Sequence, residues 1–319
     1  VFEDGPKRDR RMWMGDLRLQ ALVNYASYRN LDLVKRSLYL FAGSRFPDGR
    51  IAACIFTEPE PEADDTCLFD YMLFYPALLE EYLEACEKEK VAAEKTAEVL
   101  DDLYAIAQQQ IDLALAHVDD AGLVHGEELG TVFVDWAEEL DKAGCAQAIL
   151  IYAMEYAAKL AARKGDSERE SFLQEKKAAL KQAAREHFWC EKKQCFTSGG
   201  QAALATQTWM VLAGVATEEE AQGIFDRADD FSKEYRMTTP YMHHYYIMAL
   251  LSHGRTEQAL GHIRWYWGGM VEAGMDTCPE TWVPGDPDAS PYGGAAVNSY
   301  CHAWSCTPAY LLPAFFWYR

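Results

Sequence analysis

Helical segments follow one another along almost the whole chain, and apolar segments alternate with strongly charged ones. Residues 70–86 are apolar on most sides, whereas residues 87–102 are rich in Lys and Glu and read as a solvated outer face. Apolar residues recur at helical spacing in about eleven segments, with few candidate strands between them. Buried helices that alternate with solvated ones predict an all-α toroid of inner and outer helices, an (α/α)6 barrel.

The count of segments is about one helix short of six complete pairs. We expect the missing first helix to precede residue 1, because the chain begins inside a motif rather than at a Met. Residues 1–16 would then form a loop at the barrel mouth. No fixed-length repeat occurs, which argues against a solenoid. We therefore expect residues 1–319 to form a single barrel domain.

Charge and cysteine usage narrow the partners of this domain. The formal net charge of −20 disfavours nucleic acid and anionic membrane surfaces, and no apolar run is long enough to span a bilayer. The 9 cysteines are an odd number without a CxxC pair, which favours reduced thiols in the cytoplasm. Neither a phosphate loop nor a nucleophilic serine motif occurs. We therefore expect a neutral or cationic ligand.

The opening stretch, VFEDGPKRDRRMWMGD, combines acids, cations and a Trp at unusual density. A site that cleaves sugars needs carboxylates for proton transfer, cations to hold them and an aromatic face for the ring. The candidate acids here are Asp4, Asp9 and Asp16.

A second acid is needed for glycoside hydrolysis, because one carboxyl group protonates the leaving oxygen and the other attacks carbon or activates water. The loop at 276–299 offers Glu280 in the sequence CPETW, with Trp282 two residues later. Long loops in compact domains are often functional. Acids beside Trp in two such loops favour a paired-carboxylate site.

At this point the residues resemble a known family. The run DGPKRDRRMWMGD is similar, without a gap, to the signature of α-L-rhamnosidases of glycoside hydrolase family 78, Asp-Cys-Pro-x-Arg-Glu-Arg-x-Gly-Trp-x-Gly-Asp. The ETW at 280–282 also matches that family. The segment SYCHAWSCTP at 299–308 resembles its His-x-Trp-Ser-x-x-Pro segment. The resemblance therefore extends from one end of the chain to the other.

The resemblance implies an (α/α)6 barrel and an inverting glycosidase that releases terminal α-L-rhamnose. By matching position, Asp9 would be the general acid and Glu280 the general base, about 6.5–9.5 Å apart with water between them. Asp4 and Asp16 would hold hydroxyl groups of the sugar. The pocket would be completed by Arg8, Trp13, Asp135, Trp136, Trp282 and His302. Neither a metal nor a cofactor is implied.

This chain departs from the family pattern in several places. Asp9 is one methylene shorter than the usual Glu, Met12 replaces a Gly, and Gly5 replaces a Cys. These changes bear on the identity of the sugar and leave a catalytically inactive, sugar-binding relative open. The β-sandwich domains that commonly flank the family's barrel are absent from this sequence.

Other classes of function remain as alternatives. Another α/α-barrel glycosidase, such as an unsaturated uronyl hydrolase, would also use paired carboxylates. A helical scaffold would use none. Cys278, Cys301, His302 and Cys306 could be zinc ligands, although their spacing does not match a zinc motif. The pair His243–His244 could be catalytic, but on an apolar helix packing or pocket lining is the stronger interpretation.

Overall fold

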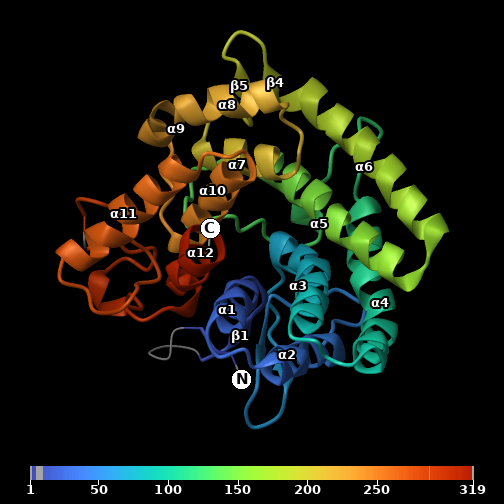
Figure 1. Ribbon diagram of the computed structural model, residues 1–319. Coiled ribbons are helices and arrows are strands. Elements are labelled where there is room, and N and C mark those ends of the chain that lie inside the picture. The colour runs from blue at the N-terminus through green and yellow to red at the C-terminus, as the bar shows by residue number, and fades with distance from the viewer. Residues whose placement is uncertain (1, 5–9, 287, 318–319) are drawn as a thin grey trace.

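The helices form two concentric rings in the computed structural model, which describes residues 2–4, 10–286 and 288–317. The inner helices are α1 (Met14–Ala26), α3 (Phe69–Lys88), α5 (Ala143–Lys164), α7 (Leu204–Leu212) and α10 (Pro240–Ser252). Each contacts the next, and the segments η3 (Ala303–Cys306) and α12 (Pro308–Leu312) close the ring against α1 (Figure 1). The predicted all-α barrel is confirmed.

The outer helices lie around this ring (Figure 1). They are α2 (Leu31–Gly43), α4 (Ala93–Leu115), α6 (Ser167–Phe188), α8 (Glu218–Asp226), α9 (Ala228–Glu234) and α11 (Thr256–Glu272). The sequence of each helix explains whether it lies in the inner or the outer ring of helices. The outer α6 buries only one stripe, Leu173, Leu180, Ala184 and Phe188, at helical spacing. The inner α5 is rich in buried alanines, which let α3, α4, α6 and α7 approach it closely.

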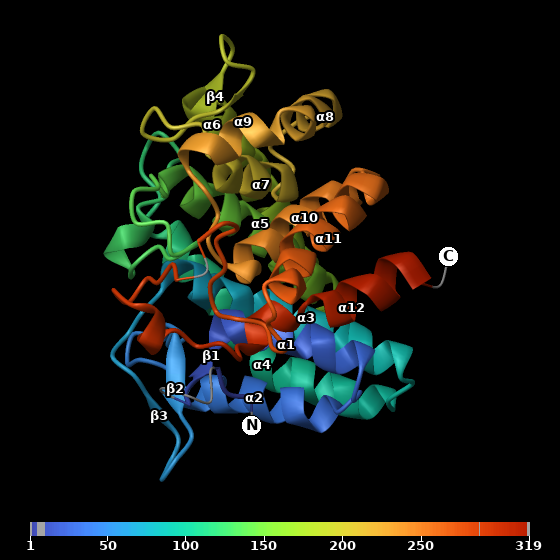
Figure 2. The same ribbon diagram turned by 90° about the vertical axis from the view of Figure 1, so that its left-hand side faces the viewer.

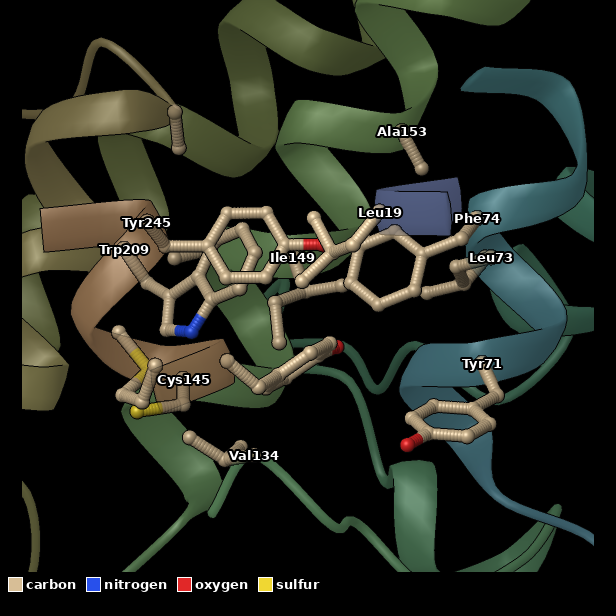
Figure 3. Packing of buried hydrophobic residues seen from close by; sticks show 14 of the residues in the cluster. Leu19, Tyr71, Leu73, Phe74, Val134, Cys145, Ile149, Ala153, Trp209 and Tyr245 are labelled. Atoms are coloured by element: carbon tan, nitrogen blue, oxygen red, sulfur yellow. The ribbon is translucent and has the colours of Figure 1, made fainter. Parts of the chain in front are cut away.

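Aromatic rings fill the lumen below the mouth. Phe74 of α3 stacks on Tyr245 of α10 with ring centroids 5.9 Å apart, and Trp209 of α7 lies 4.4 Å from Tyr245 (Figure 3). Each ring is large and fully buried. The barrel is therefore a packed core rather than a channel, and a ligand can enter only above these rings.

Two small sheets join the loops within the described ranges. One is antiparallel, in the order β1 (Met12–Trp13), β2 (Cys54–Phe56) and β3 (Glu62–Ala63). The other is the hairpin of β4 (Trp189–Cys190) and β5 (Cys195–Phe196). The first sheet lies at the same end of the barrel as the long loop that precedes η3 (Figure 2). It thereby fixes the opening segment beside that loop.

The helix starts differ from two predictions. Asp16 was expected as a possible cap, but α1 begins at Met14 and Asp16 lies in its first turn. Asp32 was expected to cap α2, but the cap is Asn30, whose side chain accepts a hydrogen bond from the Leu33 amide at 3.1 Å. In both cases a residue two or three positions earlier ends the extended segment.

The C-terminal segment also differs from its prediction as one apolar helix over 301–316. It consists of η3, the short α12 and the π-type turn η4 (Pro313–Trp317). Pro313 has no amide hydrogen to donate, so the α-helical hydrogen-bond ladder ends there. By contrast, the predicted capping box at Thr217 and Glu220 is confirmed at the start of α8.

The loop at 276–299 is irregular, as predicted, apart from the short turn η2 (Ala295–Val297). A further turn, η1 (Gly126–Glu128), lies in the loop before α5. None of the helices in the described part of the chain has both the length and the apolar character needed to cross a bilayer.

Candidate active site

Hydrogen bonds and an ion pair hold residues 3, 4 and 11 of the opening segment in place. The Asp4 amide donates to the Arg11 carbonyl at 2.9 Å, and Gln20 of α1 donates to the Glu3 carbonyl at 2.7 Å. Arg11 forms an ion pair with Asp64 at 2.8 Å. The residues on either side of the run are therefore held in place by α1 and the three-stranded sheet.

Two predicted site residues, the general acid Asp9 and the contact residue Arg8, lie outside the described residues. Their roles stay predictions. Trp13 is described and is half-buried in β1, where its ring meets the edge of Tyr71 at 6.3 Å.

Asp16 is presented at the mouth by the first turn of α1. Its residue is only 2 % exposed, and the Tyr71 hydroxyl donates to its Oδ2 at 3.4 Å. Gly15 makes this contact possible, because a Cβ there would lie 2.4 Å from the Tyr71 ring. Burial, together with the charges of Asp16 and Asp70, raises the pKa of Tyr71. Tyr71 therefore stays protonated as a donor.

His302 lies between the carboxylates of Asp4 and Asp16. Its Nε2 is 3.8 Å from Asp4 Oδ2, and its Nδ1 is 3.6 Å from Asp16 Oδ1. All three residues are buried, and the imidazole packs on Trp304 with ring centroids 4.4 Å apart. The two ends of the sequence therefore meet in one polar cluster.

Glu280 is held by the same C-terminal segment. Its amide donates to the Ser299 carbonyl at 2.8 Å, and its carbonyl accepts from Trp304 Nε1 at 3.0 Å. The Tyr292 hydroxyl donates to its Oε1. A hydroxyl donor stabilises an ionised carboxylate, which is the form that a general base needs.

Trp136 connects this acid to the loop before α5. Its ring meets Tyr292 at 5.5 Å and Phe133 at 5.2 Å, each edge-on. Trp136 itself is half-buried. It therefore offers part of an aromatic surface beside the residue that contacts Glu280.

Asp135 is turned toward the protein. Its carboxylate accepts from the Thr238 amide at 2.7 Å, the Thr238 hydroxyl at 3.0 Å and the Trp136 amide at 2.9 Å. Burial raises the pKa of Asp135, and these hydrogen bonds oppose the shift. This geometry makes Asp135 a residue that ties its loop to the start of α10, while its predicted sugar contact stays a prediction.

Asp70 holds the turn that precedes Asp135. Its carboxylate accepts from the Phe133 and Val134 amides at 3.0 and 2.9 Å. Val134 has φ of 58°, a left-handed conformation that is costly for a β-branched residue. Strain of this kind persists only where the surroundings impose it, and it is common at functional sites. Asp70 supplies that constraint from the first turn of α3.

Trp282 is nearly buried behind Glu280. Its amide donates to the Thr238 carbonyl at 3.0 Å, and its carbonyl accepts from the Tyr266 hydroxyl at 2.9 Å. Thr238 therefore joins the loops of Asp135 and Glu280. We assign Trp282 a positioning role in this conformation, and its direct contact with a sugar stays a prediction.

Sequence reasoning missed three residues of this site: Asp70, Tyr71 and Tyr292. A signal was present for Asp70, because an acid in the first turn of an apolar inner helix recurs at Asp16. No comparable pattern marks Tyr292, which lies in an irregular loop.

A cavity of about 510 Å³ opens beside Trp136 and the residue that follows Glu280. It is lined by Trp136, Thr238, Thr281 and residues 289–291, among others. Its volume is in the range of small-molecule sites. A larger cavity of about 800 Å³ lies between α8, α9, α10 and α11. The described residues that line it include none of the predicted site residues. Of these two cavities, the smaller one is therefore the one that adjoins a predicted site residue, Trp136.

The two alternatives based on His and Cys do not gain support. In the described ranges, no group of three or more His, Cys, Asp or Glu side chains is arranged to hold a metal ion. His243 and His244 are buried on α10, and His243 stacks on Tyr266 with ring centroids 3.7 Å apart. Packing, rather than catalysis, is the interpretation that fits their positions.

Comparison with known proteins identifies this architecture. The model of the bacterial alpha-L-rhamnosidase 6 hairpin glycosidase domain matches residues 1–315. A solved rhamnosidase from Klebsiella oxytoca with rhamnose bound is 43 % identical, with a TM-score of 0.91. That match covers 98 % of this chain and 60 % of the Klebsiella chain, so this chain spans less than two thirds of that relative.

More distant structures share the fold. A family 78 rhamnosidase of a Bacillus species is 24 % identical at a TM-score of 0.78, over 97 % of this chain and 32 % of its own. A family 63 mannosylglycerate hydrolase from Thermus thermophilus is 13 % identical at a TM-score of 0.67, over 96 % of this chain and 93 % of its own. The search of curated proteins found no match. The barrel, its mouth and the family match together assign the chain to the bacterial α-L-rhamnosidase six-hairpin glycosidase domains.

Proposed function

We propose that this chain is the catalytic unit of an inverting glycosidase that releases terminal α-L-rhamnose from small-molecule or oligosaccharide rhamnosides. The observation that carries the proposal is that His302 lies between Asp4 and Asp16 in this family's barrel, on the segment that also holds the backbone of Glu280. The Klebsiella oxytoca relative, solved with rhamnose bound, supports the choice of sugar.

Two acids divide the chemistry in this proposal. Asp9 donates a proton to the glycosidic oxygen, which is a poor leaving group without it. Glu280 accepts a proton from a water molecule that attacks the anomeric carbon from the opposite face. Attack from the opposite face inverts the configuration, so an α-rhamnoside yields β-rhamnose first. Tyr292 would keep the Glu280 carboxylate directed at that water.

Asp4 and Asp16 would hold the hydroxyl groups of the rhamnose ring, since ionised carboxylates only accept hydrogen bonds and sugar hydroxyls donate them. Their negative charge would also stabilise the oxocarbenium-like transition state, in which positive charge develops on the ring. His302 stands between them and would keep their spacing fixed.

The aromatic side chains would bind the apolar parts of the sugar. Rhamnose is a deoxy sugar whose methyl group cannot form hydrogen bonds, so an apolar contact suits it best. Trp13 and Trp136 are half-buried and can offer ring surface. Arg8 would complete the pocket, and Trp282 and Asp135 would hold the loops from behind.

An aryl α-L-rhamnoside tests the proposal. We expect the protein to hydrolyse it, and proton NMR during the first turnovers should show β-rhamnose before mutarotation. Asp9→Asn and Glu280→Gln should each lower kcat by about 10²–10⁴-fold, the usual contribution of general acid–base catalysis. Glu89→Gln, which removes an acid at the exposed end of α3, is the matched control and should retain wild-type kcat.

Each part of the proposal can fail separately. First release of the α-anomer would contradict inversion. Wild-type turnover in either acid variant would contradict the role given to that acid. Binding of rhamnose without any hydrolysis, measured by calorimetry, would identify a sugar-binding relative instead.

A further inference from the structure

Three cysteines surround the segments that carry Glu280 and His302. Cys278 precedes Glu280 by two residues, Cys301 precedes His302, and Cys306 ends η3. Cys278 is half-buried, and Cys301 and Cys306 are exposed. None of the 9 cysteines is in a disulfide. The proposed chemistry uses none of these thiols.

The structure brings Cys278 and Cys306 together although they are far apart in the sequence. The His302 backbone joins them, because its amide donates to the Cys278 carbonyl at 2.8 Å and its carbonyl accepts from the Cys306 thiol at 3.9 Å. The two thiols are close enough for each to shift the pKa of the other. The thiol pair therefore sits across the junction of the two site segments.

The same junction is what fixes Glu280. Ser305 of η3 donates to the Pro279 carbonyl at 2.6 Å, and Trp304 donates to the Glu280 carbonyl. Cys278 and Cys306 lie just outside these two contacts in sequence. Any change in the distance between the two sulfurs must therefore be transmitted to the backbone on either side of Glu280.

One thiol of the pair is prepared for reaction. The neighbouring Cys306 thiol lowers the pKa of the Cys278 thiol, against the effect of burial. The presence of Cys278, with burial, raises the pKa of Cys306. A thiolate is the nucleophile in cysteine oxidation, and a nearby thiol can resolve the first product into a disulfide. The arrangement has an attacking sulfur and a resolving sulfur.

We propose that Cys278 and Cys306 form a redox-sensitive pair that closes into a disulfide and switches off the proposed glycosidase. The Cys278 thiolate attacks the O–O bond of a peroxide, giving a sulfenic acid and, after proton uptake, water. The Cys306 sulfur then attacks the sulfenic sulfur, loses its proton and expels hydroxide, which leaves as a second water. Two thiols lose two electrons, and hydrogen peroxide accepts them.

Closure of the disulfide would pull the two segments together. A disulfide holds the sulfurs about 2.05 Å apart with a fixed dihedral angle, which is closer than two thiols in van der Waals contact. A displacement of about 1 Å near a reacting group can cost about 10²-fold in rate. We therefore expect oxidation to lower kcat strongly, and a thiol reductant to restore it.

The switch rests on the proposed function for its activity readout, but the disulfide can be measured without it. Oxidation with hydrogen peroxide should lower the intact mass of the full chain by about 2 Da for each disulfide formed, and peptide mapping should join Cys278 to Cys306. On the aryl rhamnoside, kcat should fall by about 10-fold or more, with recovery in dithiothreitol. Cys278→Ser and Cys306→Ser should keep their kcat under the same oxidant.

Two controls separate this pair from other thiols. Cys301→Ser leaves the pair intact and should lose activity on oxidation like the wild type. Cys190 and Cys195 face each other in the β4–β5 hairpin, so Cys195→Ser tests whether a distant thiol pair is responsible. Equal loss of activity in Cys306→Ser, or a link from Cys278 to Cys301, overturns the proposal. A mapped Cys278–Cys306 disulfide in a protein that cleaves no rhamnoside overturns only the proposed function, whereas absence of the link overturns the switch.

Discussion

Two clusters of charged residues in the described part of the barrel differ in their contacts: the lumen cluster around Arg18, and the mouth cluster of Asp4, Asp16 and His302. Inside the ring of inner helices, Arg18 contacts Glu81 at 2.6 Å and donates to the hydroxyls of Tyr152 at 2.7 Å and Tyr245 at 3.2 Å. Four aromatic rings surround the guanidinium at 5.3–5.6 Å. One cation faces one carboxylate, and protein groups meet it on every side.

In the mouth cluster, the imidazole of His302 lies between the carboxylates of Asp4 and Asp16. The separations from His302 to the two aspartates, 3.6 and 3.8 Å, are longer than hydrogen bonds. Both clusters are buried, so burial alone does not mark a functional site. The length of the contacts is the difference that separates the two clusters, and the variants below test what it means for stability and activity.

The largest expected effect is on stability, and it tests the lumen cluster around Arg18. Arg18→Met removes the cation and leaves Glu81 among aromatic rings, so the free energy of unfolding should fall by about 3–5 kcal/mol, the usual cost of breaking a buried pair. The urea midpoint measures this. The fraction that remains folded should still turn over substrate at near the wild-type kcat.

Arg29→Met is the matched control, because Arg29 is exposed and forms a long ion pair with Glu89, at 3.9 Å. An exposed pair contributes about 0–1 kcal/mol, so its midpoint should stay near the wild type. An equal loss in both variants would show that the lumen cluster is no more important for stability than a surface pair.

Asp16→Asn, at the mouth, should lower activity without lowering stability, which is the opposite of the result expected for Arg18→Met. The variant keeps the shape of the side chain and removes its negative charge, so kcat/KM should fall by about 10²–10³-fold, as for loss of one transition-state contact. The thermal midpoint should stay near the wild-type value. Enzyme kinetics and calorimetry on the same sample measure both.

Asp32→Asn is the control for this change, since Asp32 occupies the first turn of the outer helix α2. Its kcat/KM should remain at the wild-type value. If Asp16→Asn instead loses stability and keeps its activity, the mouth cluster is structural and the distinction between the clusters fails.

The lumen cluster should also give stability a pH dependence. Burial lowers the pKa of His244 to about 3, and the charge of Arg18 adds to the effect. The unfolded chain protonates this residue below about pH 6.5, whereas the fold keeps it neutral. Its contribution is therefore complete above about pH 6.5 and is lost as the pH falls toward 3, by about 1.4 kcal/mol per pH unit.

His244→Phe removes this titration. The loss of unfolding free energy between pH 7 and pH 5, from urea titrations, should be smaller in the variant by about 2 kcal/mol. Some dependence should remain, because burial also lowers the pKa of His262, to about 4. If the variant loses as much unfolding free energy between pH 7 and pH 5 as the wild type, His244 is not the source of this pH dependence.

The smallest effect concerns the contact that shapes the mouth. Gly15→Ala would place a methyl group 2.4 Å from the Tyr71 ring, which is enclosed by other rings and cannot move freely. Overpacking costs about 1–3 kcal/mol, partly offset by about 1 kcal/mol from the better helix propensity of Ala. The thermal midpoint should fall slightly, and kcat/KM should fall with it as Tyr71 leaves Asp16.

Gly268→Ala in α11 is the control, because nothing lies within 4 Å of its added Cβ. This variant should be as stable as the wild type or slightly more stable. A Gly15→Ala protein that behaves like Gly268→Ala would show that Tyr71 can move without consequence.

Local sequence predicted most of the fold because helical periodicity and capping residues act over a few positions. The helix predicted over 217–230 nevertheless divides into α8 and α9 at Arg227, whose φ of −116° departs from the helical value. No Gly or Pro marks that break. The helix predicted over 301–316 ran too far because its apolar character was given more weight than Pro313, which the sequence shows and which ends α12.

The site was accessible to sequence reasoning only where the motif or the loop position marked a residue. Arg18 gives no such signal, since one Arg in an apolar helix looks like a solvated side chain, and its partner Glu81 is 63 positions away. The orientation of Asp135 also depends on distant residues, because Thr238 supplies two of its hydrogen bonds. Long-range partners of this kind are decided by packing.

Closure of the ring by α1 and α12 has a consequence for biosynthesis. The helix α1 leaves the ribosome long before His302 and η3, because almost the whole barrel separates them in the sequence. Until η3 and α12 are made, the apolar flank of α1 that faces them has no partner, so the nascent chain exposes it to chaperones and to other chains. A product that ends before this closing segment would therefore leave the ring open and would be prone to aggregate.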